Sequence, residues 1–372
     1  MIYERLDCRL CGGYVTDVLT LTPTPLANLF PDEPYAGEKF PLGLKQCGQC
    51  KHVQVSHVVR DQEIFNGLYR YETPAALSDA MKVRAKQLRE QYKGANTLLE
   101  IGANNGLFLH ALHDAGFPVV IGIDPSSTDP LVWKLPFNVK SALLVKERIG
   151  KVDLIIANNV FAHIDDLRHI FTAIDTVLSP DGALVFEVQY LLPMAKRGAF
   201  DMIYHEHRDY HTLGPLSAFL FNCGLVMTDY EIFSAHGGSI RVTAKRGGLA
   251  KEPPLEEIYW SAFELAIGRE KSALRGLLPK RIPAFGAPAK AVTLIHHFGL
   301  QDRIEYCVDD TKGKQGRYIA GTNIPVVGAE VMEKDKPKEM LLLSWNYADI
   351  IRKRFPHIDF IVPFSQRQLL AA

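Results

Sequence analysis

The sequence contains no long hydrophobic run and no excess of charge of either sign. Its apolar stretches are all shorter than the roughly 20 residues that a membrane-spanning helix requires, and the opening residues, MIYERLDCRL, are charged where a signal peptide is apolar. Its 42 basic residues are balanced by 42 acidic ones, which removes the electrostatic argument for a nucleic-acid or membrane partner. We therefore expect a cytoplasmic protein that binds neither nucleic acid nor membranes.

Cysteine is also scarce, but four of the six cysteines form two closely spaced pairs. They follow the patterns Cys8-x-x-Cys11 and Cys47-x-x-Cys50, and each pair offers two thiolates on a tight turn, as tetrahedral zinc requires. Two unrelated thiol pairs or disulfides are the alternative, which a cytosolic setting disfavours. Four thiolates leave no open coordination position, so the predicted zinc is structural.

The 372 residues, 47% of them hydrophobic, suit two or three domains. From about residue 95, short and nearly continuous apolar runs alternate with amphipathic helices, which indicates a parallel sheet covered on both faces. Residues 227–246 suggest an antiparallel ending, and a second α/β unit begins near residue 250. Helices are also expected over 78–94, capped by Ser78 or Asp79, and over 254–278.

The glycine turn in LEIGANNG follows the first of these predicted strands. A dinucleotide fingerprint reads G-x-G-x-x-G, whereas here an asparagine stands in the place of the middle glycine. The pattern favours a ligand without phosphates, S-adenosylmethionine (SAM), although a turn that only packs helix against strand is the alternative. An acid ending the next strand can accept both ribose hydroxyls. The expected cofactor-binding residues are Glu100, Gly102, Asn104, Gly106, Asp124 and Asn158.

Proton-transfer groups are concentrated in AFDMIYHEHRDYH, residues 199–211, directly after an apolar run. If this segment is extended, His205 and His207 share a face, and if it is helical, His207 and His211 do. The H-x-x-x-H spacing also suits a helical metal pair, but the HExxH order is absent and no third ligand is obvious. A purely structural hydrogen-bonding cluster is the remaining alternative.

Several separate motifs occur in a characteristic order between residue 8 and about residue 327. They are the paired CxxC knuckles, TPLANLF, YRYETP, EIGANNG, NNVFAHI, YHEHRDYH, HGGSIRV, FGAPAKA and KGKQGRYIAGTNIPV. In this combination the chain resembles the sugar-nucleotide C-methyltransferases, which add a branch methyl to dTDP-4-keto-deoxysugars. The resemblance implies an α/β protein with a zinc-binding domain (1–65), a Rossmann-like SAM-binding domain (66–248) and a second Rossmann-like domain for the nucleotide sugar (249–372). It also favours a monomer.

The same resemblance implies roles for individual residues. His207 would be the base, with Tyr204 and Glu206 assisting it, His163 lining the same cleft, and Tyr71 closing over the sugar. Two departures from the family pattern are ETPAALS after the tyrosines and an asparagine at position 105, where an aspartate is more usual. The expected substrate-binding residues are Tyr69, His236, Arg241 and Lys290.

Methyl transfer to carbon needs a carbanion equivalent, and a carbon beside a ketone can supply one as an enolate. Imidazole, with a pKa of about 6.5, is too weak a base to form it alone, so hydrogen-bond donors must also stabilise the oxyanion. Candidate donors are Tyr71, His163, Tyr204 and His236. The expected substrate is a dTDP-4-keto-6-deoxyhexose, methylated at C3 or C5. Competing hypotheses are a non-catalytic nucleotide-sugar-binding protein and an NAD-dependent sugar oxidoreductase.

Overall fold

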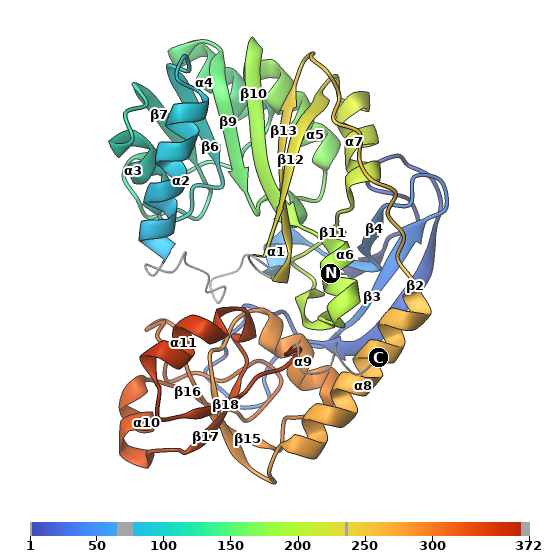
Figure 1. The fold of residues 1–372 in the computed structure, drawn as a ribbon, viewed down its shortest axis with the longest axis vertical. Helices are drawn as coiled ribbons and strands as arrows, with labels where there is room; N and C mark the ends of the chain where they lie inside the picture. Colours follow the sequence, from blue (N-terminus) through green and yellow to red (C-terminus); the bar gives the residue numbers. More distant parts are fainter. Residues whose placement is uncertain (1, 65–76, 235–236, 366–372) are drawn as a thin grey trace.

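The computed structural model describes residues 2–64, 77–234 and 237–365 of the chain. Figure 1 shows an upper lobe built on a seven-stranded sheet, a lower lobe built on a five-stranded sheet, and an N-terminal sheet that lies along one side of both. Within the described ranges, no helix combines the length and apolar character needed to cross a membrane.

The upper sheet has the strand order β12-β13-β10-β9-β6-β7-β8. Strands β10, β9, β6, β7 and β8 are parallel, and β13 and β12 complete the sheet in antiparallel pairing. The chain leaves β6 toward β7 and returns on its other side at β9, so the strand order reverses between β6 and β9, where such sheets bind ligands. The bounds are β6 Thr97–Ile101, β7 Val119–Ile123, β8 Val132–Trp133, β9 Val152–Asn158, β10 Leu178–Gln189, β12 Val226–Phe233 and β13 Ser239–Lys245.

Helices cover both faces of this sheet, as the continuous apolar strands predict. Leu98 of β6 is buried among residues of α2 and α3, whereas its neighbour Leu99 is buried on the opposite face with residues of α4, α5 and α7. Successive side chains of a strand point to opposite faces, so a strand covered on both sides must be apolar throughout. The bounds are α2 Ser78–Gln91, α3 Leu107–Asp114, α4 Val139–Ile149, α5 Leu167–Val177 and α7 Leu213–Asn222.

The N-terminal region forms a four-stranded sheet of order β11-β4-β3-β2, and a separate pair joins β1 to β5. Its outer strand β11 comes from residues 209–210, near the end of the histidine-rich segment, and pairs with Val53 and Gln54 of β4. The segment is therefore part of the N-terminal sheet as well as of the upper lobe. The bounds are β1 Ile2–Glu4, β2 Val15–Thr24, β3 Phe40–Cys47, β4 Val53–Val55, β5 His57–Val59, α1 Asp61–Ile64 and β11 Asp209–Tyr210.

The lower sheet is parallel throughout, with the strand order β16-β15-β14-β17-β18. Its order reverses between β14 and β17, so the glycine turn in the FGAPAKA motif, which follows β14, also lies at a switch point. The bounds are α8 Trp260–Leu277, β14 Ile282–Phe285, α9 Lys290–Phe298, β15 Ile304–Val308, β16 Val326–Val327, α10 Ala329–Asp335, β17 Glu339–Leu342, α11 Ala348–Arg354 and β18 Asp359–Ile361.

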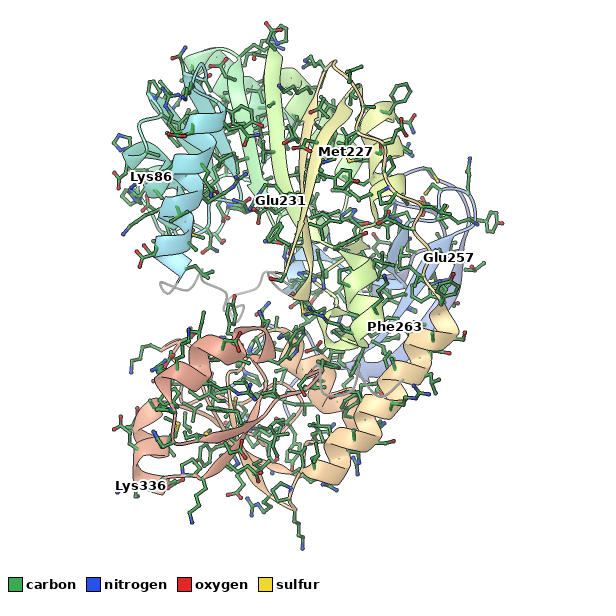
Figure 2. All side chains as sticks on the ribbon, viewed as in Figure 1. Lys86, Met227, Glu231, Glu257, Phe263 and Lys336 are labelled. Atoms are coloured by element: carbon green, nitrogen blue, oxygen red, sulfur yellow. The ribbon has the colours of Figure 1, made fainter. Side chains whose placement is uncertain are left out.

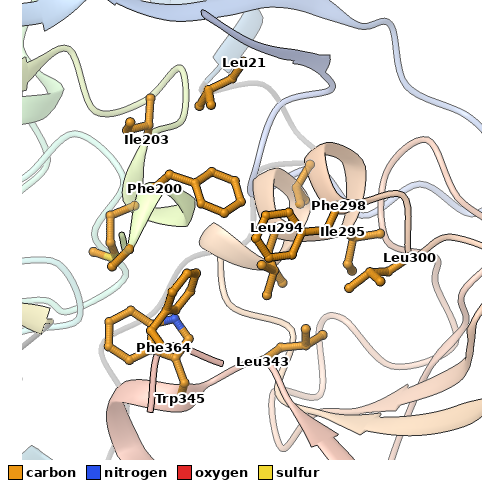
Figure 3. Close-up of a cluster of buried hydrophobic side chains, with 14 of the residues drawn as sticks. Leu21, Phe200, Ile203, Leu294, Ile295, Phe298, Leu300, Leu343, Trp345 and Phe364 are labelled. Atoms are coloured by element: carbon orange, nitrogen blue, oxygen red, sulfur yellow. The ribbon is translucent and has the colours of Figure 1, made fainter. Parts of the chain in front are cut away.

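One hydrophobic core joins the N-terminal sheet to the lower lobe. Leu21 of β2, Phe200 and Leu294 of α9 belong to the same buried cluster (Figure 3), and Phe263 of α8, labelled in Figure 2, packs into it. The ring centroids of Phe200 and Phe298 are 4.8 Å apart. Because Phe200 opens the histidine-rich segment, this core anchors that segment at its start.

Three local predictions differ from the structure. Helix α2 begins at Ser78 with Leu77 as its N-cap, so neither Ser78 nor Asp79 caps it. Helix α8 begins only at Trp260, because the Glu256 carboxylate accepts hydrogen bonds from Tyr190 Oη (2.5 Å) and the Leu213 amide (2.6 Å) and so holds the preceding residues against the upper lobe. The histidine-rich segment is neither a helix nor a continuous strand.

Candidate active site

The glycine turn after β6 has left-handed backbone geometry, which favours glycine and, less strongly, asparagine. Gly102 and Gly106 have φ of +74° and +75°, and Asn104 has φ of +48°. A Cβ on Gly102 would lie 2.4 Å from Cγ2 of Val160, so the turn packs directly against the residues that follow β9. Helix α3 begins immediately after Gly106.

The other predicted cofactor residues lie at the same edge of the sheet. Asp124 follows β7, and its carboxylate accepts hydrogen bonds from the Asn104 amide (3.0 Å) and the Ser126 amide (2.7 Å). Asn158 is the last residue of β9 and is half-buried. The structure thus gathers the six residues around the switch point of the sheet, while their contact with SAM stays a prediction.

Glu100, at the base of this turn, supplies a test of whether the site fits SAM. The side chain is buried, and its Oε2 has no hydrogen-bond partner within residues 2–64, 77–234 and 237–365. Burial, with a smaller contribution from the Asp124 charge, raises the pKa of Glu100 to about 8. A cationic ligand would offset both effects, and SAM carries a sulfonium and an ammonium group, so this site fits SAM.

We expect SAM binding at pH 7 to release up to about one proton per molecule, because a carboxyl with a pKa of about 8 is mostly protonated at that pH and must ionise to pair with a cation. Calorimetric titrations in two buffers of different ionisation enthalpy would measure this release. Glu100→Gln is the matched control and should release almost none. Equal binding heats for the wild-type protein in both buffers would contradict the prediction.

A second group of side chains lies beside this turn. His163 ends the short helix η2 (Phe161–His163), which follows β9 and begins next to Val160. Its ring centroid is 4.9 Å from that of His207, in an edge-on arrangement. Nε2 of His207 is 2.7 Å from the Tyr204 hydroxyl, and the two rings stack with centroids 4.1 Å apart. His207 therefore contacts two other predicted catalytic residues, near the predicted SAM-binding edge.

The electrostatic setting keeps one of these imidazoles neutral. Burial lowers the pKa of His163 to about 4; the Glu206 carbonyl partly opposes this shift and the Arg208 charge adds to it. His163 is thus uncharged at neutral pH. A neutral His163 does not repel a proton taken up by His207, so the pair suits a base beside a neutral hydrogen-bonding partner.

Glu206 and Arg208 flank His207 and point into the N-terminal region. Oε1 of Glu206 accepts hydrogen bonds from the backbone amides of Ala27 and Asn28, both at 3.1 Å. These amides belong to the TPLANLF motif, so this carboxylate ties that motif to the histidine-rich segment. Nη2 of Arg208 donates to the Val59 carbonyl at 3.1 Å and to Asp61. Burial raises the pKa of Glu206.

The other two histidines of the segment have different surroundings. Nε2 of His205 lies 3.2 Å from the Pro41 carbonyl, and His211 is buried with its ring centroid 5.5 Å from that of His52. Burial lowers the pKa of each histidine, His205 and His211, to about 4. Across the described ranges, the only group of three or more residues arranged to hold a metal is the four cysteines, so the structure does not support a metal site at His207 and His211.

The four paired cysteines form the expected metal cluster. Their sulfur atoms all lie within 4.8 Å of one another, with Cys8 and Cys50, and Cys11 and Cys47, each 3.5 Å apart. The Cys50 thiol lowers the pKa of Cys8 by hydrogen bonding, and this shared proton raises the pKa of Cys50. A divalent cation replaces such protons and lets every sulfur bind as a thiolate. The donor set and its compactness fit tetrahedral zinc.

Two predicted substrate-binding residues have intramolecular partners. Lys290 is buried, its ammonium donates to Asn346 Oδ1 at 2.8 Å, and it lies 3.6 Å from the centre of the Trp345 ring. Trp345 Nε1 in turn donates to Asp201 Oδ2 at 2.6 Å. Burial lowers the pKa of Lys290 and raises that of Asp201, while their opposite charges stabilise each other. The histidine-rich segment thus reaches the switch point of the lower sheet through Asp201.

Arg241, the other described substrate-binding candidate, lies in an ion-pair network on the upper sheet. Its Nε donates to Glu187 Oε1 at 2.7 Å and its Nη1 to Glu231 Oε2 at 2.6 Å, the latter on β12 (Figure 2). The remaining predicted site residues, Tyr69, Tyr71 and His236, lie outside the described residues.

Sequence reasoning missed a buried charge cluster behind the histidines. Asp209 Oδ1 accepts from Arg9 Nε at 2.9 Å and lies 2.8 Å from His52 Nε2, and the Arg9 charge and the His52 hydrogen bond hold the pKa of Asp209 below its usual range. Arg9 stands between the two cysteines of the first knuckle. The sequence did contain a signal for this cluster. Arg9 and Asp209 are charged residues in otherwise apolar or metal-binding surroundings, and a buried charge requires a partner.

The fold, together with the predicted cofactor-binding residues at one edge of the upper sheet, defines a SAM-dependent methyltransferase with an added zinc-binding module. Three family models match successive parts of the chain: a zinc binding domain over residues 8–65, a methyltransferase domain over 69–229, and a C-methyltransferase C-terminal domain over 259–361. The chain is 31% identical to the C-methyltransferase NovU of Streptomyces niveus, in an alignment that covers 98% of this chain and 97% of that protein. The chain therefore belongs to the C-methyltransferase family.

Solved structures match a smaller part of the chain. The mitomycin 7-O-methyltransferase MmcR is 19% identical with a TM-score of 0.35, covering 46% of this chain and 56% of that one. A SAM-dependent methyltransferase from Clostridium acetobutylicum is 15% identical with a TM-score of 0.36, covering 44% of this chain and 91% of that one.

Proposed function

We propose that this C-methyltransferase acts on a nucleotide-linked 4-keto-deoxysugar and methylates C3, the carbon beside the keto group, with His207 as the base. The observation that carries the proposal is the contact of His207 with Tyr204 and His163, next to a glycine turn that packs against Val160. A proton acceptor, a phenol and a neutral imidazole thus lie at the edge that we propose binds SAM, whose methyl group is carried on a positively charged sulfur.

The proposed chemistry assigns one task to each residue. His207 takes the proton from the carbon beside the ketone, and the electron pair of the broken C–H bond moves into an enolate. Tyr204 and the neutral His163 donate hydrogen bonds to the oxygen where charge develops, a contribution typically of about 3–4 kcal/mol per donor. The enolate carbon then forms its bond to the methyl carbon as the carbon–sulfur bond breaks, and its electron pair goes to sulfur. The proton on His207 is released to solvent.

We further propose that the zinc-binding domain spans residues 1–65, the SAM-binding domain 66–248 and the nucleotide-binding domain 249–372. The parallel lower sheet, with its own switch point beside Lys290, supports a nucleotide site in the last of these. Tyr69, Tyr71, His236 and Arg241 stay proposed contacts of the sugar nucleotide. A dTDP-4-keto-6-deoxyhexose is the proposed substrate.

The test is to incubate the purified protein with SAM and a dTDP-4-keto-6-deoxyhexose in deuterium oxide and to analyse the sugar by mass spectrometry and NMR. We expect the gain of one methyl group at C3. Deuterium at C3 without methylation supports the base but rejects this sugar as the methyl acceptor. Methylation at C5 would overturn the assignment of the carbon. Neither exchange nor methylation across a panel of 4-keto nucleotide sugars would overturn the proposal.

A further inference from the structure

The two candidate catalytic histidines come from two separate segments of the chain. His163 ends η2 and His207 lies in the loop before β11, and the backbone link between the two segments is a hydrogen bond from the Arg208 amide to the Ala162 carbonyl, at 2.7 Å. The separation of the two rings depends on this bond, on the Glu206 carbonyl that acts on the His163 ring, and on what else holds residues 162–165 against residues 207–209.

Arg9 spans this junction from the N-terminal side. Its side chain is only 1% exposed; Nε donates to Asp209 Oδ1 at 2.9 Å, Nη1 donates to Asp165 Oδ1 at 2.8 Å, and Nη2 donates to the Ile164 carbonyl. Asp209 is two residues beyond His207, and Ile164 and Asp165 directly follow His163. One planar guanidinium therefore binds both histidine-bearing segments at once.

The position of Arg9 is itself fixed by the fold. It lies between Cys8 and Cys11, whose sulfurs belong to the compact four-cysteine cluster, and its backbone amide donates to Gln54 Oε1 at 2.9 Å. The planar guanidinium holds its hydrogen-bond partners in a fixed geometry, which a flexible lysine does not do. The knuckle can therefore set the geometry of the histidine pair without touching substrate.

We propose that Arg9 is a positioning residue that fixes the spacing of His163 and His207, so that the metal-binding knuckle acts on the rate of methyl transfer through this side chain. The catalytic part of the inference rests on the proposed function, whereas the geometric part does not. A displacement of about 1 Å at a reacting group can lower a rate about a hundredfold, so a loosened histidine pair should lower kcat more than it weakens binding.

The test compares Arg9→Lys with Arg168→Lys. Arg168 also reaches the first knuckle, with Nη2 donating to the Leu10 carbonyl at 2.8 Å, but this contact involves neither histidine-bearing segment. We expect Arg9→Lys to lower kcat by about 10- to 100-fold, with the KM for the sugar nucleotide, the Kd of SAM and the zinc content close to wild type. Arg168→Lys should leave kcat within about twofold, as surface changes usually do.

A readout independent of activity is the NMR spectrum of protein labelled with 15N-histidine. The ring resonances of His163 and His207, assigned by substituting each with glutamine, should shift in Arg9→Lys and stay in place in Arg168→Lys. If Arg9→Lys is insoluble, Asp165→Asn replaces it, because Asp165 is only half-buried. It should shift the same resonances, because Asp165 binds the Arg9 guanidinium on the His163 side.

Unchanged ring resonances in the Arg9→Lys variant, or equal shifts in the Arg168→Lys variant, would overturn the inference. In the event that Asp165→Asn is the variant studied, wild-type resonances and kcat would overturn it as well. Absence of methyl transfer in the wild-type protein would reject the proposed function alone, since the resonances still report whether Arg9 holds the two rings.

Discussion

His207→Ala is expected to lower the rate of methyl transfer by about 10³-fold or more, within the range that general-base catalysis contributes, while the Kd of SAM changes by less than about threefold. The loss is large because His207 is the member of the cluster that contacts both Tyr204 and His163. SAM affinity is spared because the predicted cofactor residues lie on the turn after β6 and the ends of β7 and β9. Single-turnover rates and calorimetric SAM titrations measure the two quantities separately.

The matched control is His205→Ala, which changes a buried histidine only two residues away. His205 lies beside the Pro41 carbonyl and packs edge-on against Phe40, with ring centroids 5.8 Å apart, so its loss should lower the melting temperature yet keep the rate within about fivefold. In deuterium oxide, His207→Ala should also stop exchange at the substrate carbon. An active His207→Ala variant would reject His207 as the base, and a variant that loses SAM affinity as well would indicate a folding defect.

The features predicted best from sequence are those that depend on neighbouring residues. Leu98 and Leu99 are both apolar because helices cover both faces of β6, and this continuity predicted a covered parallel sheet. The glycine turn was equally local, since a positive φ at Gly102 and the absence of a side chain against Val160 leave few alternatives to glycine. The Cys-x-x-Cys pairs carry their ligand geometry in their spacing, so the metal cluster was predictable too.

Contacts between distant residues could not be predicted in this way. Arg9 and Asp209 are 200 positions apart, and periodicity contains no information about which buried arginine meets which buried acid. The pairing of β11 with β4 was missed because two residues are too few to show an alternating pattern. The start of α8 was predicted too early because Glu256, an ordinary helix residue by propensity, binds Tyr190 and Leu213.

The acids of the histidine-rich segment bind the lower lobe and the N-terminal region, which gives the composition of the segment a physical explanation. Asp201 contacts Trp345 of the lower lobe, Glu206 contacts the amides of residues 27 and 28, and Asp209 contacts Arg9. The acids of the segment thus serve as attachment points, one to the lower lobe and two to the N-terminal region. A loop without regular secondary structure gains a defined shape from these contacts, and that shape determines where His207 lies.

The largest effect on stability is expected at the metal cluster. We expect about one zinc ion per chain in freshly purified protein, and we expect Cys8→Ser to abolish metal retention and yield unfolded or insoluble protein. The apparent binding free energy of structural zinc in small modules, about 10–16 kcal/mol, is as large as the whole net stability of a typical domain, about 5–15 kcal/mol. Elemental analysis and thermal melts with and without a chelator measure both effects.

Cys223→Ser is the matched control, because Cys223 is half-buried on the upper lobe and lies outside the four-cysteine cluster. It should keep the zinc and melt within a few degrees of wild type. Cys8 also adjoins Arg9, so a chelated protein that stays folded should show the displaced histidine resonances expected of Arg9→Lys. Zinc-free purified protein, or a Cys8→Ser variant with wild-type metal content and melting temperature, would contradict a structural zinc. If loss of zinc leaves the histidine resonances in place, the metal does not determine the spacing of His163 and His207.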